Sequence, residues 1–210
     1  DCLNRGRMIL RDIKSGRKVE HDVDDFQRRL CGFGYTTEDI EQIIKPMAIT
    51  GAEPLYAMGD DTPLAVLSEK PQRFFNYFRQ KFAQVTNPAI DPIRESAVMS
   101  LSSYIGSVKG NILKPSPELC KVVKLSSPVL TNDEMETLRN LSYKGFKTIT
   151  LPMTFNPKGG YREMERSITK LCEDAAEAVD KGYNYLIISD KMVDRDNAPI
   201  PSLLAMSAVH

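Results

Sequence analysis

The sequence predicts an α/β fold in which a mainly parallel sheet is flanked by helices and preceded by a short β-hairpin and a helical linker. Three observations predict it. Residues 147–151 ("KTITL") are strand-like, residues 161–181 repeat apolar side chains at helical spacing, and residues 185–189 ("YLIIS") form a continuous apolar run. A helix between two strands implies parallel pairing, and a strand that is apolar on both faces implies layers on either side of the sheet.

The composition narrows the function classes. The chain has 210 residues, of which 41% are hydrophobic and 27% charged, enough to bury a core. Its 28 basic residues balance 28 acidic ones, so we expect neither nucleic acid nor an anionic membrane as a partner. No apolar run approaches the roughly 18 residues of a membrane span, and the N-terminus lacks a signal-peptide pattern. We expect a soluble protein that is cytoplasmic, or plastid if it comes from a photosynthetic eukaryote.

The N-terminal part predicts a hairpin and then a helix. Residues 7–12 ("RMILRD") and 17–20 ("RKVE") flank a turn-like stretch. This hairpin is expected to belong to a preceding domain, with nothing later in the chain attached to it. The helix that follows has Thr36 or Thr37 as its N-cap and a kink or stop near Pro46. Its apolar face carries Ile40, Ile43, Ile44 and Met47.

Two more helices are expected before the next strand. Residues 71–83 open with a proline and repeat aromatic side chains in a stripe typical of a core, namely Phe74, Phe75, Phe78 and Phe82. Asp91 caps the second helix, which runs to Gly106 and aligns Ile93, Ala97, Leu101 and Tyr104 on one face. Residues 121–125 ("KVVKL") then predict a strand, and Thr131 or Asn132 caps another helix.

The cysteines and histidines do not predict a metal site. The four cysteines are isolated from one another and only two histidines are present: Cys2, Cys31, Cys120, Cys172, His21 and His210. No Cys/His signature for a nucleophile is visible. The thiols are therefore expected to be small core side chains, most of all Cys172.

Two turns after the strands hold weaker site patterns. Lys158, Gly159 and Gly160 would offer N–H groups and one charge to a phosphate, but a plain glycine turn is favoured because no G-x-G-x-x-G or Walker pattern is present. Three aspartates follow the last strand with Lys191 and Arg195 among them, so an ion-paired, solvated loop is preferred to a cation site: Asp190, Asp194 and Asp196.

Three longer strings carry a resemblance to a known family. They are "MGDDTPLAVLS" at 58–68, "FAQVTNPAIDPIRE" at 82–95 and "NYLIISDKMVDRDNAPIPSLLAMSAVH" at 184–210. In this order they resemble the central domain of the large subunit of glutamate synthase, and the N-terminal residues resemble the closing hairpin of its glutamine amidotransferase domain. The expected domains are therefore the hairpin at 1–25, a helical linker at 26–55 and a central α/β domain at 56–210, truncated at its C-terminal end.

The resemblance implies a part of an enzyme that moves the amide nitrogen of glutamine to 2-oxoglutarate and reduces the product to glutamate. In that family a separate barrel domain holds FMN and an iron-sulfur cluster, so no cofactor is expected in this fragment. The fragment alone is expected to be non-catalytic, and Cys2 is not taken as the glutaminase nucleophile. The implied partners are the glutaminase and FMN-binding domains of the same polypeptide, with a reductase subunit or ferredoxin as electron donor.

The resemblance also implies that the central domain forms part of an ammonia tunnel. Ammonia must stay neutral and away from bulk water, so its wall should combine apolar side chains with hydroxyls and carbonyls and avoid free carboxylic acids. The first two strings supply the candidate lining, which is Met58, Gly59, Thr86, Asn87 and Ile90. Tight turns at a domain boundary explain the same residues equally well. Asp61 and Arg94 are candidates for a contact with the FMN domain.

Two other interpretations stay open. An independent α/β module would bind a nucleotide or flavin through the turns after its strands, with the segment 158–160 on the phosphate. A generic interaction domain is the least specific of the three.

Overall fold

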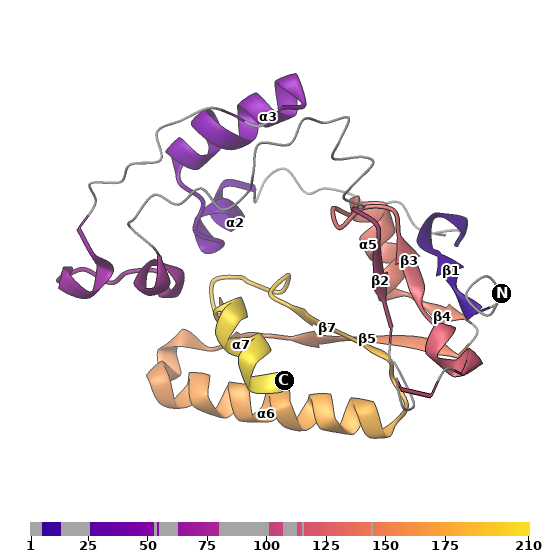
Figure 1. The fold of residues 1–210 in the computed structure, drawn as a ribbon. Coiled ribbons are helices and arrows are strands. Elements are labelled where there is room, and N and C mark those ends of the chain that lie inside the picture. Colours follow the sequence, from indigo (N-terminus) through magenta and orange to yellow (C-terminus); the bar gives the residue numbers. More distant parts are fainter. Residues whose placement is uncertain are drawn as a thin grey trace.

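The computed structural model describes residues 6–13, 26–52, 54, 63–79, 101–106, 113–114, 116–143 and 145–210. Figure 1 shows the two linker helices on one side of the molecule and the strands and longer helices on the other. Within the described residues the strands form three small sheets, and helices pack against them. The fold class is α/β, as the sequence predicts.

A strand–helix–strand unit forms the best-defined part of the fold. Strand β5 (Phe146–Pro152) is followed by α6 (Gly160–Asp180) and then by β7 (Tyr185–Ser189), and the two strands pair in parallel from Thr148↔Tyr185 to Pro152↔Ser189. In Figure 1, α6 runs alongside the pair, with α7 (Ser202–Val209) next to it. The buried residues of this core are Leu151, Met153, Leu171, Ala175, Ile200 and Ala205. The crossover predicted from 147–151, 161–181 and 185–189 is confirmed.

The second core lies around the start of the chain and the start of β5. Strand β3 (Val123–Leu125) pairs in parallel with β1 (Met8–Ile9) and antiparallel with β2 (Ser103–Ile105). Helix α5 (Asn132–Arg139) covers this sheet and contacts β5. The buried residues are Met8, Leu10, Val123, Leu125, Leu138, Leu141 and Phe146.

One tyrosine ties β7 to the core around β3. The Tyr185 ring stacks on Phe146, with centroids 5.7 Å apart, and its hydroxyl donates to the Ile105 carbonyl at 2.9 Å. Burial raises the pKa of this phenol to about 12, so it remains a neutral donor at all physiological pH values. The group therefore holds β7 against β2 rather than serving as an acid or base.

The sheets are mixed rather than mainly parallel. Strand β4 (Ser142–Tyr143) pairs antiparallel with β5, and β6 (Thr154–Phe155) pairs antiparallel with β8 (Ala198–Pro199). Among the described pairings, only β1 with β3 and β5 with β7 are parallel. The sequence signal failed here because strands of two or three residues are too short to show a periodic pattern, and β6 and β8 pair across the whole crossover unit.

The described part of the N-terminal segment pairs with a strand from much later in the chain. Among the described residues of this segment Met8–Ile9 form a strand and Leu10–Asp12 a 3₁₀ turn, and the predicted return strand at 17–20 lies outside them. The partner of β1 is β3, with Met8 opposite Val123. The prediction that nothing later in the chain attaches to this segment is wrong, because Met8 and Leu10 are apolar and find their core with β3 and α5.

The linker helices are longer than expected. Helix α2 (Phe26–Gly32) is followed by a wide π-helical turn at Asp39–Ile44 that runs directly into α3 (Lys45–Thr50). Thr36 is the cap: its N–H and hydroxyl donate to Asp39 Oδ2, and the Asp39 N–H donates back to Thr36 Oγ1. The helix does not stop at Pro46, which lies at the start of α3 directly after the π-helical turn.

Two predicted helices are wrong where the structure describes them. Phe74–Phe78 form a 3₁₀ turn, and the aromatic stripe is not core because Phe75 is 50% and Phe78 67% exposed. At the end of the second predicted helix, residues 103–105 form strand β2 instead. Phe82 and the start of that helix, including Asp91, Ile93 and Ala97, lie outside the described residues. Helical spacing alone did not distinguish these segments from turns and strands.

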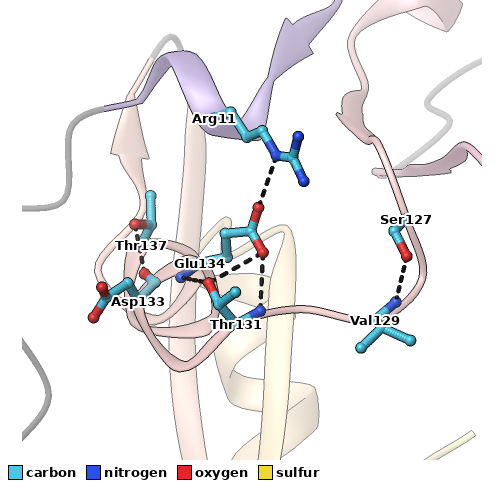
Figure 2. A network of polar contacts seen from close by, with 7 residues as sticks. All are labelled: Arg11, Ser127, Val129, Thr131, Asp133, Glu134 and Thr137. Atoms are coloured by element: carbon cyan, nitrogen blue, oxygen red, sulfur yellow. Dashed lines mark hydrogen bonds and ion pairs between the residues drawn. The ribbon is translucent and has the colours of Figure 1, made fainter. Parts of the chain in front are cut away.

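A capping box begins α5 and ties it to the N-terminal segment (Figure 2). The Glu134 N–H donates to Thr131 Oγ1, while the Thr131 N–H and hydroxyl donate to Glu134 Oε2 at 2.9 and 3.1 Å. The other oxygen of Glu134 accepts from Arg11 Nε at 3.2 Å. The Thr131 backbone N–H, followed by Arg11, lowers the pKa of the Glu134 carboxyl below its usual 4.5. Of the two caps that the sequence allows, Thr131 and Asn132, the structure selects Thr131.

This capping box predicts a specific loss of stability in acid. Because the folded pKa of Glu134 is depressed, its stabilisation is complete above its unfolded pKa and is lost as the pH falls through the folded value. The parent should therefore be more stable than Glu134→Gln near neutral pH, with a difference that narrows below about pH 4.5. Urea unfolding of both proteins between neutral and acid pH measures this difference. The control Glu165→Gln, on the exposed face of α6, should differ from the parent by an amount that does not change with pH. A difference in unfolding free energy between the parent and Glu134→Gln that stays constant with pH would contradict the prediction.

Candidate functional site

All of the site residues predicted from sequence lie outside the described residues: Met58, Gly59, Asp61, Thr86, Asn87, Ile90 and Arg94. Their roles in tunnel lining and domain contact stay predictions. The described end of the first string, after Asp61, is a 3₁₀ turn at Ala65–Leu67 in which Ala65 is buried and Val66 and Leu67 are exposed.

An apolar cleft lies at the carboxyl end of β5 and β7. It has a volume of about 440 Å³ and is lined by Phe75, Met153, Ile188, Ser202, Leu203 and Met206. This is the edge at which open α/β sheets bind ligands, because helices cover the faces and loops open only at the strand ends. We refer to these residues as the apolar cleft.

The inner end of the apolar cleft is rigid. Met153 directly follows β5; its N–H donates to the Ser189 carbonyl and its own carbonyl accepts from the Ile200 N–H, both at 2.9 Å. These bonds hold Met153 between the end of β7 and the segment that enters α7. Its side chain is buried and packs in the core with Ile200.

The outer rim of the apolar cleft comes from α7 and the 3₁₀ turn at Phe74–Phe78. Ser202, Leu203 and Met206 lie on successive turns of α7 and are exposed, as is Phe75. The Ser202 hydroxyl is the one polar side chain among the described lining residues, and none of them is ionisable. Chemically, the apolar cleft suits a small neutral molecule and offers it one hydrogen-bonding group.

A second, charged hollow lies where α2 meets the loop after β7. It has a volume of about 600 Å³ and is lined by Arg28, Arg29, Gly32, Val193, Asp194 and Arg195. A Cβ placed on Gly32 would lie 3.7 Å from Val193 Cγ2, so the helix approaches the loop closely. Its guanidinium groups make this hollow unlike the apolar cleft, since they favour anions over neutral molecules.

The loop after β7 is ordered by its own aspartates. Asp194 Oδ1 accepts from the N–H groups of Asp196 and Asn197 at 2.8 Å, and the Asn197 side-chain amide also donates to it. The Asn197 side chain, followed by these backbone groups, lowers the pKa of the Asp194 carboxyl. Asp196 pairs with Lys158 at 2.6 Å. The ion pair of this loop is thus made with Lys158, and pairing of its aspartates with Lys191 and Arg195 stays a prediction. Among the described residues there is no cluster of metal-ligating side chains.

The glycine turn before α6 is closed to a phosphate. The Lys158 N–H donates to Asn156 Oδ1, the Gly159 N–H to the Asn156 carbonyl, and the Gly160 N–H to the Pro157 carbonyl. The Lys158 ammonium is paired with Asp196. Because the donors that a phosphate needs are already used inside the turn, the geometry does not favour a nucleotide or flavin here.

The described cysteines do not form a nucleophilic site. Cys172 is half-buried and its thiol lies 3.3 Å from the Ala208 carbonyl, to which it donates, and Cys120 is also half-buried. Cys31 is exposed, so the prediction that it is a core side chain is wrong; it lies on α2, which has no buried residue. Cys2 lies outside the described residues.

Sequence reasoning passed over the lining of the apolar cleft. Met153 lies two residues after the strand predicted at 147–151, and Leu203 and Met206 are three residues apart in an apolar segment at the end of the third string. Both patterns are visible in the sequence, but methionine and leucine are ordinary core residues. Only the strand order, which the sequence does not display, shows that they line one cleft. None of the helices in the described part of the chain is long and apolar enough to cross a bilayer.

Comparison with known proteins gives a consistent result. Residues 28–210 match the family model of the glutamate synthase central domain. The ferredoxin-dependent glutamate synthase of Pyropia yezoensis is 44% identical over 212 residues, an alignment that covers 100% of this chain and 14% of the relative. Ferredoxin-dependent glutamate synthase 2, chloroplastic, of Arabidopsis thaliana is 46% identical, with 96% of this chain and 12% of the relative covered.

A third relative is named for a different electron donor. Glutamate synthase [NADH] of Schizosaccharomyces pombe is 40% identical, with 90% of this chain and 9% of the relative covered. The chain thus spans less than a sixth of the length of each of these relatives. The similarity is comparable for relatives named for ferredoxin and for NADH, so this segment does not distinguish between the two donors.

Proposed function

The chain belongs to the glutamate synthase central domain family, and from this membership we propose that it is the connecting domain of a glutamate synthase. In this role it links a glutaminase domain to an FMN-binding synthase domain of the same polypeptide. It also forms part of the wall along which ammonia passes from one to the other. The compartment we propose is the cytoplasm, or the plastid if the source is a photosynthetic eukaryote.

The apolar cleft is the observation that supports a share in the ammonia route. Neutral ammonia can be desolvated at little cost, whereas ammonium cannot, so a wall without carboxylates or bases keeps the molecule uncharged. The described lining of the apolar cleft contains no ionisable group and one hydroxyl. The charged hollow lacks this property, since it is lined by arginines and Asp194.

The two strings at 58–68 and 82–95 remain our candidates for further lining of the route. Met58 and Ile90 would contribute apolar surface, Thr86 and Asn87 hydrogen-bonding groups, and Gly59 close approach of the backbone. Asp61 and Arg94 are proposed to contact the FMN domain. FMN and an iron-sulfur cluster are proposed to lie in the other parts of the enzyme, with ferredoxin or a reductase subunit as electron donor.

A coupling measurement on the full-length enzyme tests the ammonia route. Ser202→Asp places a carboxylate at the rim of the apolar cleft and should raise the glutamine hydrolysed per glutamate formed several-fold, because ammonia protonates or escapes there. The matched control is Ser207→Asp, an exposed position on the same helix that does not line the apolar cleft. Met58→Trp and Thr86→Trp test the other candidate wall in the same assay.

The outcomes separate the two walls. A parent-like ratio for Ser202→Asp together with Met206→Trp would remove the apolar cleft from the route. Normal coupling with bulky side chains at both Met58 and Thr86 would remove the two strings. An increase in Ser207→Asp equal to that in Ser202→Asp would show a general effect of charge on α7 instead.

A further inference from the structure

We propose that residues 6–13 are a docked segment, here called the strap, and that the edge of β3 with the first turn of α5 is the surface that receives it. The strap lies ahead of residues 28–210, the range that matches the family. It nevertheless supplies a strand to a sheet whose other strands lie inside that range. The central fold thus takes up an extended segment from upstream.

The backbone of the strap completes the sheet. Met8 lies opposite Val123 and Ile9 opposite Lys124 in parallel register, and the Met8 N–H donates to the Val122 carbonyl at 2.9 Å. Strand β3 is the central strand of the order β1-β3-β2. Without the strap its edge would present unpaired backbone groups beside a buried valine, which is unfavourable.

Two side chains anchor the strap in the core. Met8 is 7% and Leu10 3% exposed, and both pack in the cluster that contains the fully buried Val123. Ile13 packs against the same cluster from its edge. The 3₁₀ turn at Leu10–Asp12 is what directs Leu10 inward directly after the strand. Burial of this apolar area is the main source of docking energy.

A polar clamp fixes the position of the strap on α5 (Figure 2). Arg11 Nε donates to Glu134 Oε1 at 3.2 Å, while the other carboxylate oxygen is held by the Thr131 N–H. The carboxylate is therefore oriented before Arg11 binds it, which lowers the entropy cost of the pair. Arg11 is largely exposed, so the pair contributes more to register than to affinity.

At its start, the strap requires close backbone approach. A Cβ on Gly6 would lie 2.7 Å from the Cys120 carbonyl oxygen and 2.9 Å from its carbon, distances that real side chains do not adopt. The surface formed by the edge of β3 and the first turn of α5 therefore accepts glycine at this position, apolar side chains at Met8 and Leu10, and a guanidinium at Arg11. This combination defines the extended segment that the surface recognises.

Docking of the strap would let the connecting domain position the domain that precedes it. This role rests on the proposed connecting function. In such an enzyme the strap would hold the polypeptide ahead of the central domain against β3 and α5. The joint would then be a packed interface and not a free tether, so that movement upstream is transmitted to the sheet.

Hydrogen exchange on the full-length enzyme tests the docking. The amides of β3, above all that of Lys124, which faces β1 in this register, should exchange about tenfold faster or more in Leu10→Ser and in Gly6→Val, because each variant weakens the pairing of β1 with β3. Arg11→Glu and Glu134→Arg should each speed exchange less, and the double variant should restore part of the protection. The matched control exchanges the charges of the exposed pair Glu177 and Lys181 on α6 and should leave these amides unchanged.

Three results would overturn the proposal. They are parent-like exchange at β3 in both Leu10→Ser and Gly6→Val, no recovery in the double charge variant when the single variants lose protection, and an equal effect of the control pair. Global unfolding of Leu10→Ser is recognised by fast exchange in α6. In that case the exchange of the β3 amides in Gly6→Val and in the charge variants decides whether the strap docks on β3. Ammonia coupling is measured separately, so either proposal can fail without the other.

Discussion

Ile200→Ala is expected to lower the free energy of unfolding by about 2–5 kcal/mol. Ile200 is 1% exposed and lies among the buried residues between β5, α6 and α7. Removing its side chain leaves a cavity that cannot close easily, because the Ile200 N–H is bonded to the Met153 carbonyl and holds the backbone in place. Urea unfolding of the purified chain, followed by circular dichroism, measures the loss.

A control on α6 makes this prediction specific. Val179 is 58% exposed, so Val179→Ala should change the free energy of unfolding by no more than about 0.5 kcal/mol. Similar losses for the two variants would mean that the core between the crossover unit and α7 is not packed as described. Because Met153 lines the apolar cleft, Ile200→Ala should also impair coupling in the full-length enzyme.

Thr148→Val is expected to stabilise the protein by about 1–2 kcal/mol. The Thr148 hydroxyl is buried and is the one such side-chain atom without a hydrogen-bond partner in the described residues. Valine has nearly the same shape and favours strands, while the Thr148 N–H keeps its bond to the Leu141 carbonyl at 3.1 Å. The substitution therefore removes a desolvation cost and leaves the backbone pairing intact.

Thr150→Val is the matched control for this stabilisation. Thr150 lies two residues further along β5, on the same side of the strand, and is exposed. Its substitution should leave the unfolding free energy within about 0.5 kcal/mol of the parent. A decrease in stability for Thr148→Val would show that its hydroxyl has a partner, such as a bound water, that offsets its burial.

The parts of the fold that could be predicted from sequence are local. The crossover from β5 through α6 to β7 was recognisable because an amphipathic helix between two strands permits only one kind of pairing. The helix caps were narrowed to two neighbouring residues each, because threonine and asparagine favour the position that bonds the first free N–H groups of a helix, and the structure selected Thr36 and Thr131. The family resemblance also rested on contiguous strings, which a sequence displays directly.

The failures have a common physical cause. The segment at Met8 was expected to have no partner later in the chain, although β3 pairs with it from more than a hundred residues away. The phenylalanines at 74–78 were assigned to the core, although burial depends on what the rest of the chain provides to cover them. In both cases the pattern described the segment correctly as apolar but contained no information about its partner.

By itself, the sequence determined the α/β class, the crossover unit, the helix caps to within one residue and membership of the family, because each depends on residues near one another in the chain. Tertiary structure alone decided that the strap completes the first sheet and that Met153, Ser202 and Met206 meet in one apolar cleft. These arrangements join distant segments. They are selected by the free energy of burying apolar surface in one common core, a quantity that no single segment specifies.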